Sequence, residues 1–421
     1  MHTQQQTNPP TPERLHGLDA LRGLALLLGV ALHLSMAYLP GAEYFWIVSD
    51  GQHSSVLAGL FYLIHLFRMP LFFLLAGYFG RLGLQRLGVA GFARDRYSRI
   101  VVPLVSAWPL VFTGIVIAVV WAAWLKGGGQ LPAQSPPGPK FTPDDFPLTH
   151  LWFLYVLTLY YVGMLGLRGV LALVDGRDRL GALADAGMRL LLGPWAALLL
   201  ALPLAACLAI HEGWYAWFGV PTPDQSLYPN LPALVGFGIA FGFGWLLQRQ
   251  PPLLARIAGN WPLNFALASV GIAICLTLVG VDPLLVAAAP DDAKLVYALA
   301  HGCASWALTL ALAGLALRHL SGHSATRRYL ADASYWVYLV HLPIVMLLQV
   351  AMSRLDWPWW IEYPLALMVG MALMLASYQW LVRYSWIGAR LNGKRRQRTP
   401  TATCVAPGSP AATAMSPESA A

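Results

Sequence analysis

The first apolar segment of the chain carries three side chains that hydrocarbon excludes. Residues 18–33, LDALRGLALLLGVALH, are mostly Leu, Ala, Gly and Val but include Asp19, Arg22 and His33. Eleven residues of helix make about three turns plus 20°, so Arg22 and His33 share a face, about 16 Å apart along the axis. Asp19, three residues before Arg22, lies near the same face. The pattern predicts that Arg22 binds an anion at one end of the helix. Asp19 and His33 are candidate catalytic residues, and His33 would act as general base or nucleophile.

A second apolar segment, IHLFRMPLFFLLAGYF, holds His65 and Arg68 three residues apart on one helical face. An ionisable side chain inside a span costs several kcal/mol unless it is paired or hydrated. His65 and Arg68 are therefore predicted to bind substrate. The alternative for Arg68, as for Arg22 and His33, is a purely structural role: an ion pair, a side chain reaching the membrane surface, or a histidine bonded to a neighbouring helix.

Paired arginines follow in the polar segment RDRYSRIVVP. Arg96 and Arg99 lie three residues apart just before the next apolar run. Guanidinium groups bind phosphate through paired hydrogen bonds. Arg96 and Arg99, together with Arg22, are therefore predicted to bind the phosphates of a donor substrate. The alternative is that they only set the orientation of the chain in the membrane.

Three further candidates for substrate binding lie in later apolar segments. His150 and Trp152 open the segment THLWFLYVLTLYY, and His341 lies in ASYWVYLVHLPIV, two residues before Pro343. The proline predicts a kinked helix beside a cavity. A structural role for His341 is an equally open alternative.

These residues must be positioned by membrane-spanning helices. The chain has 421 residues, of which 57% are hydrophobic and 11% charged, against roughly 25% charged residues in soluble domains. We predict an all-α polytopic membrane protein with ten transmembrane helices, because runs of about 20 apolar residues suffice to cross a bilayer. The runs are 18–39, 56–80, 100–124, 149–174, 191–211, 230–249, 260–280, 293–317, 331–353 and 361–387.

The positive charges orient these helices. With ten spans, 22 of the 27 Lys and Arg residues fall on the side of the termini, four on the other side, and Arg68 within a span. The excess of positive charge on the cytoplasmic side then places both termini in the cytoplasm and residues 125–148 in the longest outer loop. The net charge of +8 is thereby explained without nucleic acid as a partner. Residues 236–244, GFGIAFGFG, are predicted to serve close helix packing and not nucleotide binding.

The ends of the chain are expected to lie outside the membrane domain of residues 14–393. Residues 1–13 are polar and predict a flexible cytoplasmic N-terminus without a cleavable signal peptide. Residues 394–421 begin with KRRQR and continue in Ala, Pro, Ser and Thr, which predicts a disordered cytoplasmic tail. The four cysteines have neither disulfide-like nor metal-like spacing, so no metal site is expected.

In these blocks the sequence resembles the membrane-bound acyltransferase 3 family. The resemblance rests on LDALRG with Arg22 and His33, FRMPLFFLLAGYF, Arg96 and Arg99 before Pro103, HLWFL, and ASYWVYLVHLPI, in this order. It covers nearly all of residues 14–390. Within the family the chain looks most like the glucan biosynthesis protein C branch, which is implicated in succinylating periplasmic glucans.

The resemblance implies an enzyme of the bacterial inner membrane. It would move a succinyl or acetyl group from cytoplasmic acyl-CoA to a carbohydrate on the periplasmic side, without a metal. It also implies that Arg22 and His33 are essential, and it matches Arg96, Arg99, His150 and Trp152 to family motifs. Two alternatives stay open: the same chemistry on lipid A, O-antigen, peptidoglycan or a macrolide, and a transporter or flippase for an anionic substrate.

Overall fold

The computed structural model describes residues 16–393 apart from 47, 50, 133–137, 139 and 289–291. Within this part of the chain every regular element is a helix, so the predicted all-α class is confirmed. The predicted flexible N-terminus, residues 1–13, and the predicted tail, residues 394–421, lie outside the described residues.

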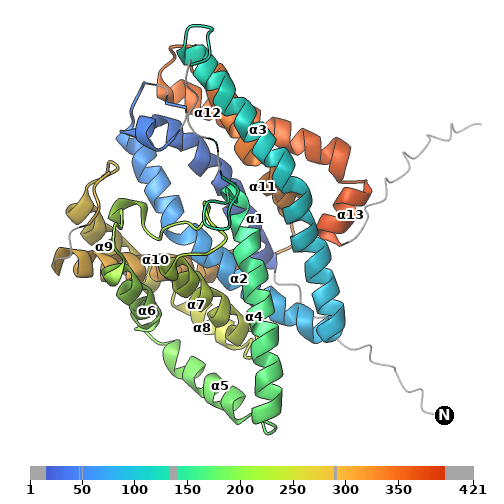
Figure 1. Cartoon of the computed structure of the whole chain (residues 1–421). Coiled ribbons are helices and arrows are strands. Elements are labelled where there is room, and N and C mark those ends of the chain that lie inside the picture. The colour runs from blue at the N-terminus through green and yellow to red at the C-terminus, as the bar shows by residue number, and fades with distance from the viewer. Residues whose placement is uncertain are drawn as a thin grey trace, which may run out of the picture.

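Thirteen α-helices form the described part of the structure (Figure 1). They are α1 His16–Ser35, α2 Ser55–Arg96, α3 Val102–Lys126, α4 Trp152–Val174, α5 Arg179–Leu191, α6 Ala196–Ile210, α7 Leu231–Leu247, α8 Leu253–Gly259, α9 Trp261–Val279, α10 Asp292–His319, α11 Ala325–Met352, α12 Trp359–Ser377 and α13 Trp386–Asn392. Short 3₁₀ turns at Met36–Tyr38, Ala42–Tyr44, Thr149–Leu151 and Ala216–Phe218 shape the connections, and π turns occupy Tyr97–Val101 and Tyr378–Val382.

Seven helical segments of the described chain are long and apolar enough to cross a membrane, or eight if one bent pair counts as a span. One of them, 55–126, contains two of the ten predicted spans in a continuous helical stretch. The predicted span 191–211 corresponds to α6, the second helix of the bent pair, and 230–249 corresponds to α7, which has 17 residues. A multi-pass membrane protein is therefore supported, while the number ten stays a prediction.

The segment between the predicted spans 56–80 and 100–124 is largely helical, with a kink in α2 at Gly88. Gly88 has a φ of 67°, a left-handed conformation that favours glycine, and it breaks α2 near its C-terminal end. The π turn Tyr97–Val101 then leads directly into α3, which packs against α11. The predicted phosphate-binding arginines Arg96 and Arg99 thus lie on helical turns.

The amphipathic helix α5 lies in a segment that the sequence analysis treated as a cytoplasmic connection. It meets α6 at an angle of 110°. Its polar side is fixed by Arg249, which bonds Asp185 at 2.6 Å and Asp178 at 2.9 Å, while Leu183 and Leu190 are exposed. The sequence analysis missed α5 because its apolar residues are too sparse for a span.

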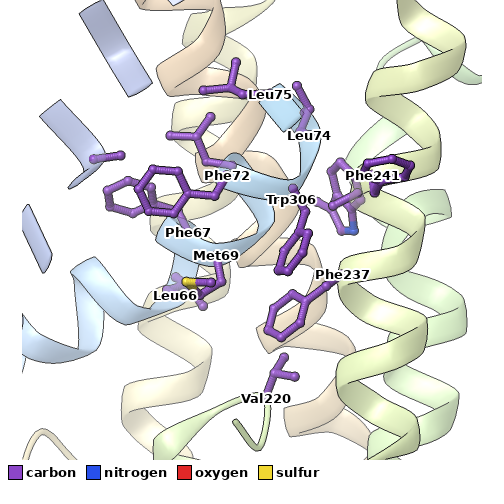
Figure 2. Close-up of a cluster of buried hydrophobic side chains, with 14 of the residues drawn as sticks. Leu66, Phe67, Met69, Phe72, Leu74, Leu75, Val220, Phe237, Phe241 and Trp306 are labelled. Carbon is purple, nitrogen blue, oxygen red and sulfur yellow. The ribbon is translucent and has the colours of Figure 1, made fainter. Parts of the chain in front are cut away.

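The centre of the bundle is held together by close contact between α2 and α7. Figure 2 shows Phe237 and Phe241 of α7 facing the part of α2 that carries Phe72 and Leu74. A Cβ atom on Gly244 would collide with the backbone oxygen of Leu74. The prediction that residues 236–244 serve helix packing is therefore confirmed, because only glycine permits this approach.

Gly244→Ala is expected to destabilise the protein by about 1–3 kcal/mol, because the added methyl group forces the two backbones apart. Gly242→Ala is the matched control, since no atom lies within 4 Å of a Cβ at Gly242 on the same helix. Thermal unfolding of both variants in detergent checks this prediction, and equal melting temperatures would contradict it.

Candidate functional site

A cavity of about 780 Å³ collects the predicted polar residues of four helices. Of the ten candidate site residues, the structure brings six to its walls: His33 of α1, His65 and Arg68 of α2, His150 and Trp152 at the start of α4, and His341 of α11. The mouth is lined by Glu43, Tyr44, Lys126, Thr222, Asp224 and Gln225. These lie in or next to the connections that the charge distribution predicts to face outward.

His33 lies in the last turn of α1, against two other rings. Its ring centroid is 5.2 Å from that of His341 and 6.2 Å from that of Trp46, whose plane is within 24° of parallel. Its Nδ1 is buried and has no hydrogen-bond partner among the described residues. The imidazole is thus oriented by ring packing and by its backbone.

His150 and His341 are coupled through one backbone carbonyl. The Nδ1 of His341 lies 2.7 Å and the Nε2 of His150 lies 3.0 Å from the carbonyl oxygen of Tyr338. A carbonyl only accepts, so both nitrogens must be donors. In the neutral rings the other nitrogens, Nε2 of His341 and Nδ1 of His150, are then acceptors, and neither has a partner in the described structure. Each of these two rings therefore brings one hydrogen-bond-accepting nitrogen to the wall of the cavity.

Arg68 is seated against the first helix. A Cβ atom on Gly29 of α1 would collide with its Nη1, so the guanidinium occupies the space that glycine leaves. The Nε of Arg68 has no partner among the described residues. His65, one turn earlier, stacks on Phe61 with ring centroids 5.3 Å apart. Arg68 is therefore a cation placed to meet an anionic or electron-rich group in the cavity.

A strained residue holds His150 in place. Thr149 has a φ of 55°, which is uncommon for a residue other than glycine. Its N–H donates to the carbonyl oxygen of Asp224 at 3.2 Å, and the Tyr338 hydroxyl donates to the His150 carbonyl at 2.9 Å. Burial raises the pKa of the Asp224 carboxyl above its usual range. The connection that carries Asp224 and helix α11 together fix the start of α4.

The four other candidate residues lie at the opposite end of α1 and α2. Arg96 and Arg99 each pair with Asp95 at 2.9 Å. Arg22 pairs with Asp19 at 3.5 Å, and its side chain is 41% exposed. The predicted phosphate-binding arginines are therefore charged groups held next to carboxylates.

Asp19 is separated from His33 along α1. Fourteen residues of helix place the two about 21 Å apart along the axis, and Asp19 is not among the residues that line the cavity. The structure does not bring together the two candidate catalytic residues. Asp19 instead positions the guanidinium of Arg22.

Aromatic residues connect the arginine end to the cavity. The ring of Tyr161 lies 5.4 Å from the Arg96 guanidinium, and the Tyr335 hydroxyl donates to the Arg99 carbonyl. Tyr335 stacks on Tyr338 at 6.3 Å, one turn further along α11. The sequence analysis missed Tyr335 and Tyr338, although Tyr338 lies three residues before His341 and therefore near its face, and Tyr335 lies three residues before Tyr338. Nothing in the sequence pointed to Trp46.

No three His, Cys, Asp or Glu side chains in the described part of the chain are arranged to hold a metal ion. Besides Glu43, Lys126 and Asp224 at the mouth, the ionisable side chains that line the cavity are four imidazoles and one guanidinium, set among aromatic rings. This set suits proton transfer and stabilisation of negative charge.

Comparison with known proteins defines the class. The acyltransferase 3 family model, described as an acyltransferase domain, matches residues 15–379, and the chain belongs to this family. The protein is thus an acyltransferase that transfers groups other than amino-acyl groups.

Particular relatives match a smaller part of the chain. Glucans biosynthesis protein C of Escherichia coli strain K12 is 31% identical over 157 residues, which cover 36% of this chain and 38% of that protein. The proteins of the same name from Escherichia coli O1:K1 / APEC and O9:H4 show the same identity and coverage. No solved structure matches the chain.

Gly29→Ala is expected to lower the rate of acyl transfer by about tenfold or more, because misplacing a reacting group by 1 Å costs up to about a hundredfold. The added methyl group would displace the Arg68 guanidinium. Gly163→Ala in α4 is the control, since nothing lies within 4 Å of a Cβ there. Transfer rates per folded protein that match the wild type would contradict a role for Arg68.

Proposed function

We propose that the protein transfers an acyl group, succinyl or acetyl, from acyl-CoA in the cytoplasm to hydroxyl groups of a periplasmic glucan or another envelope carbohydrate. The bacterial inner membrane would be its location. The observation that carries this proposal is the arrangement of two polar clusters, arginines at one end of α1 and α2 and histidines with Arg68 at the other. A donor with a phosphate end and a distant thioester fits that separation.

The arginine cluster would hold the donor. Arg22, Arg96 and Arg99 offer guanidinium groups that pair with the phosphates of coenzyme A. The axial distance from Arg22 to His33 is about 16 Å, a length that an extended pantetheine arm can span. The pairs with Asp19 and Asp95 keep the guanidinium groups in place before the donor arrives.

His33 would carry the chemistry. As general base it would take the proton of an acceptor hydroxyl while the oxygen forms a bond to the thioester carbonyl carbon. The carbon–sulfur bond then breaks, and the leaving thiolate takes up the proton. His33 as nucleophile, with an acyl-imidazole intermediate, is the second route that the same position permits.

The other cavity residues would stabilise charge and bind substrate. Arg68 and His65 would polarise the thioester carbonyl or bind the free carboxylate of a succinyl group. His150, Trp152 and His341 would contact the acceptor. At the mouth, the mixture of aromatic rings and polar groups, Tyr44, Trp46, Thr222 and Gln225, suits a carbohydrate.

The proposed topology has ten spans with both termini in the cytoplasm. The support is the distribution of positive charge, 22 of 27 Lys and Arg residues on one side. This orientation places the arginine cluster inward and the mouth of the cavity outward. The lipid bilayer is then the environment of the exposed apolar helix faces, and no nucleic acid is involved.

His33→Ala is expected to abolish acylation while leaving expression and folding intact, because it removes the proton acceptor but keeps the backbone hydrogen bond that ties the end of α1 to Gln349. Mass spectrometry of periplasmic glucans and other envelope polysaccharides, with and without the protein, would read the result. Loss of a succinyl or acetyl mass increment would identify donor and acceptor. An unchanged acylation profile with altered uptake of an anionic compound would instead favour a transporter.

Arg96→Gln is expected to raise the KM for acyl-CoA about tenfold or more with little change in kcat, since a hydrogen bond to a charged group contributes about 1.5–3 kcal/mol. Arg189→Gln is the control, because Arg189 bonds Gln250 next to α5 and lies outside the arginine cluster. Equal KM values for the two variants would contradict the assignment of the donor site.

A further inference from the structure

Gln349 of α11 is a buried amide that the proposed chemistry does not use. It is 4% exposed and is not among the residues that line the cavity. Its Nε2 donates to the carbonyl oxygens of His33 at 3.1 Å and Leu34 at 3.0 Å. Its Oε1 accepts from the indole nitrogen of Trp46 at 3.0 Å. One side chain therefore joins α11, the end of α1 and the connection that carries Trp46.

The contact lies where α1 most needs external partners. The last four carbonyls of an α-helix lack regular intrahelical donors, and α1 ends at Ser35. The Ser35 hydroxyl donates to the Leu32 carbonyl at 2.7 Å, and the Tyr363 hydroxyl donates to the Ala31 carbonyl at 3.1 Å. Gln349 donates to the carbonyl oxygens of the next two residues, His33 and Leu34.

Trp46 connects the same amide to the imidazole. Its ring stacks on that of His33 at 6.2 Å, and its backbone N–H is fixed to the Ala42 carbonyl at 2.7 Å. Functional histidines are commonly oriented by a hydrogen bond to the second ring nitrogen, but the Nδ1 of His33 has no partner among the described residues. The ring is therefore oriented by its backbone and by packing against Trp46 and His341, and Gln349 bonds to the first two of these three.

We propose that Gln349 is a positioning residue of the acyl-transfer centre: it ties the end of α1 to Trp46 and so fixes the direction of the His33 imidazole. The inference rests on the proposed role of His33. An amide offers two N–H donors and one oxygen acceptor, which matches the two carbonyls and the indole; a hydroxyl has only one donor, an ionised carboxylate has none, and an apolar side chain has neither donor nor acceptor.

The test compares two conservative variants. Gln349→Met keeps the approximate volume and removes all three hydrogen bonds. Tyr363→Phe removes one hydrogen bond to the same turn of α1 without touching Trp46. Purified full-length variants of equal thermal stability are compared for kcat and for the KM of acyl-CoA. Gln349→Met is expected to lower kcat by about tenfold to a hundredfold with an unchanged KM, and Tyr363→Phe is expected to behave as the wild type.

A second measurement does not depend on acyl transfer. Modification of individual histidines by diethyl pyrocarbonate, followed by mass spectrometry, reports how freely the His33 ring reacts. His33 is expected to be modified faster in Gln349→Met than in the wild type or in Tyr363→Phe, while His16 and His323 are unchanged. Unchanged modification of His33 would overturn the inference, as would a kcat equal to that of Tyr363→Phe. An inactive wild type would refute the proposed function alone, since the modification rates still decide the role of Gln349.

Discussion

The site depends on one constraint: the ionisable side chains of α1, α2, α11 and the start of α4 must share a polar space. Arg68 and four histidines lie within apolar helices, where each charged group would cost several kcal/mol in hydrocarbon. They are stable there because they line a single cavity with a polar mouth. Three features keep these groups around that cavity. Gly29 leaves room for the Arg68 guanidinium, Thr149 has a positive φ at the start of α4, and His150 and His341 share one carbonyl.

Helix α11 connects the parts of this arrangement. At one end Tyr335 bonds the backbone of Arg99, in the middle Tyr338 and His341 border the cavity, and further along Gln349 holds the end of α1. The residues proposed to bind the donor and the residues proposed to react with it therefore both contact one helix. A change on α11 is therefore expected to affect the end that it contacts, even where the changed residue touches neither substrate.

Much of the site could be predicted from the sequence because it follows helical periodicity. The spacing of Arg22 and His33 and of His65 and Arg68 placed each pair on one helix face, and the cavity collects His33, His65 and Arg68. What could not be predicted depends on contacts between distant segments. Trp46 stacks on His33 from a connection without a pattern. The separation of Asp19 from His33 follows from helix rise alone and could have been predicted.

For the fold as well, the positions of helices could be predicted from the sequence, whereas kinks and the angles between helices could not. Apolar runs located the helices, but the sequence could not reveal that α2 is kinked at Gly88 or that α5 bends away from α6.

The side of the membrane on which donor and acceptor are used tests the central claim, acyl transfer across the membrane, most directly. In inverted membrane vesicles with glucan inside and radiolabelled acyl-CoA outside, we expect label on the enclosed glucan. Labelling that occurs only when donor and acceptor are on the same side would contradict transfer across the membrane.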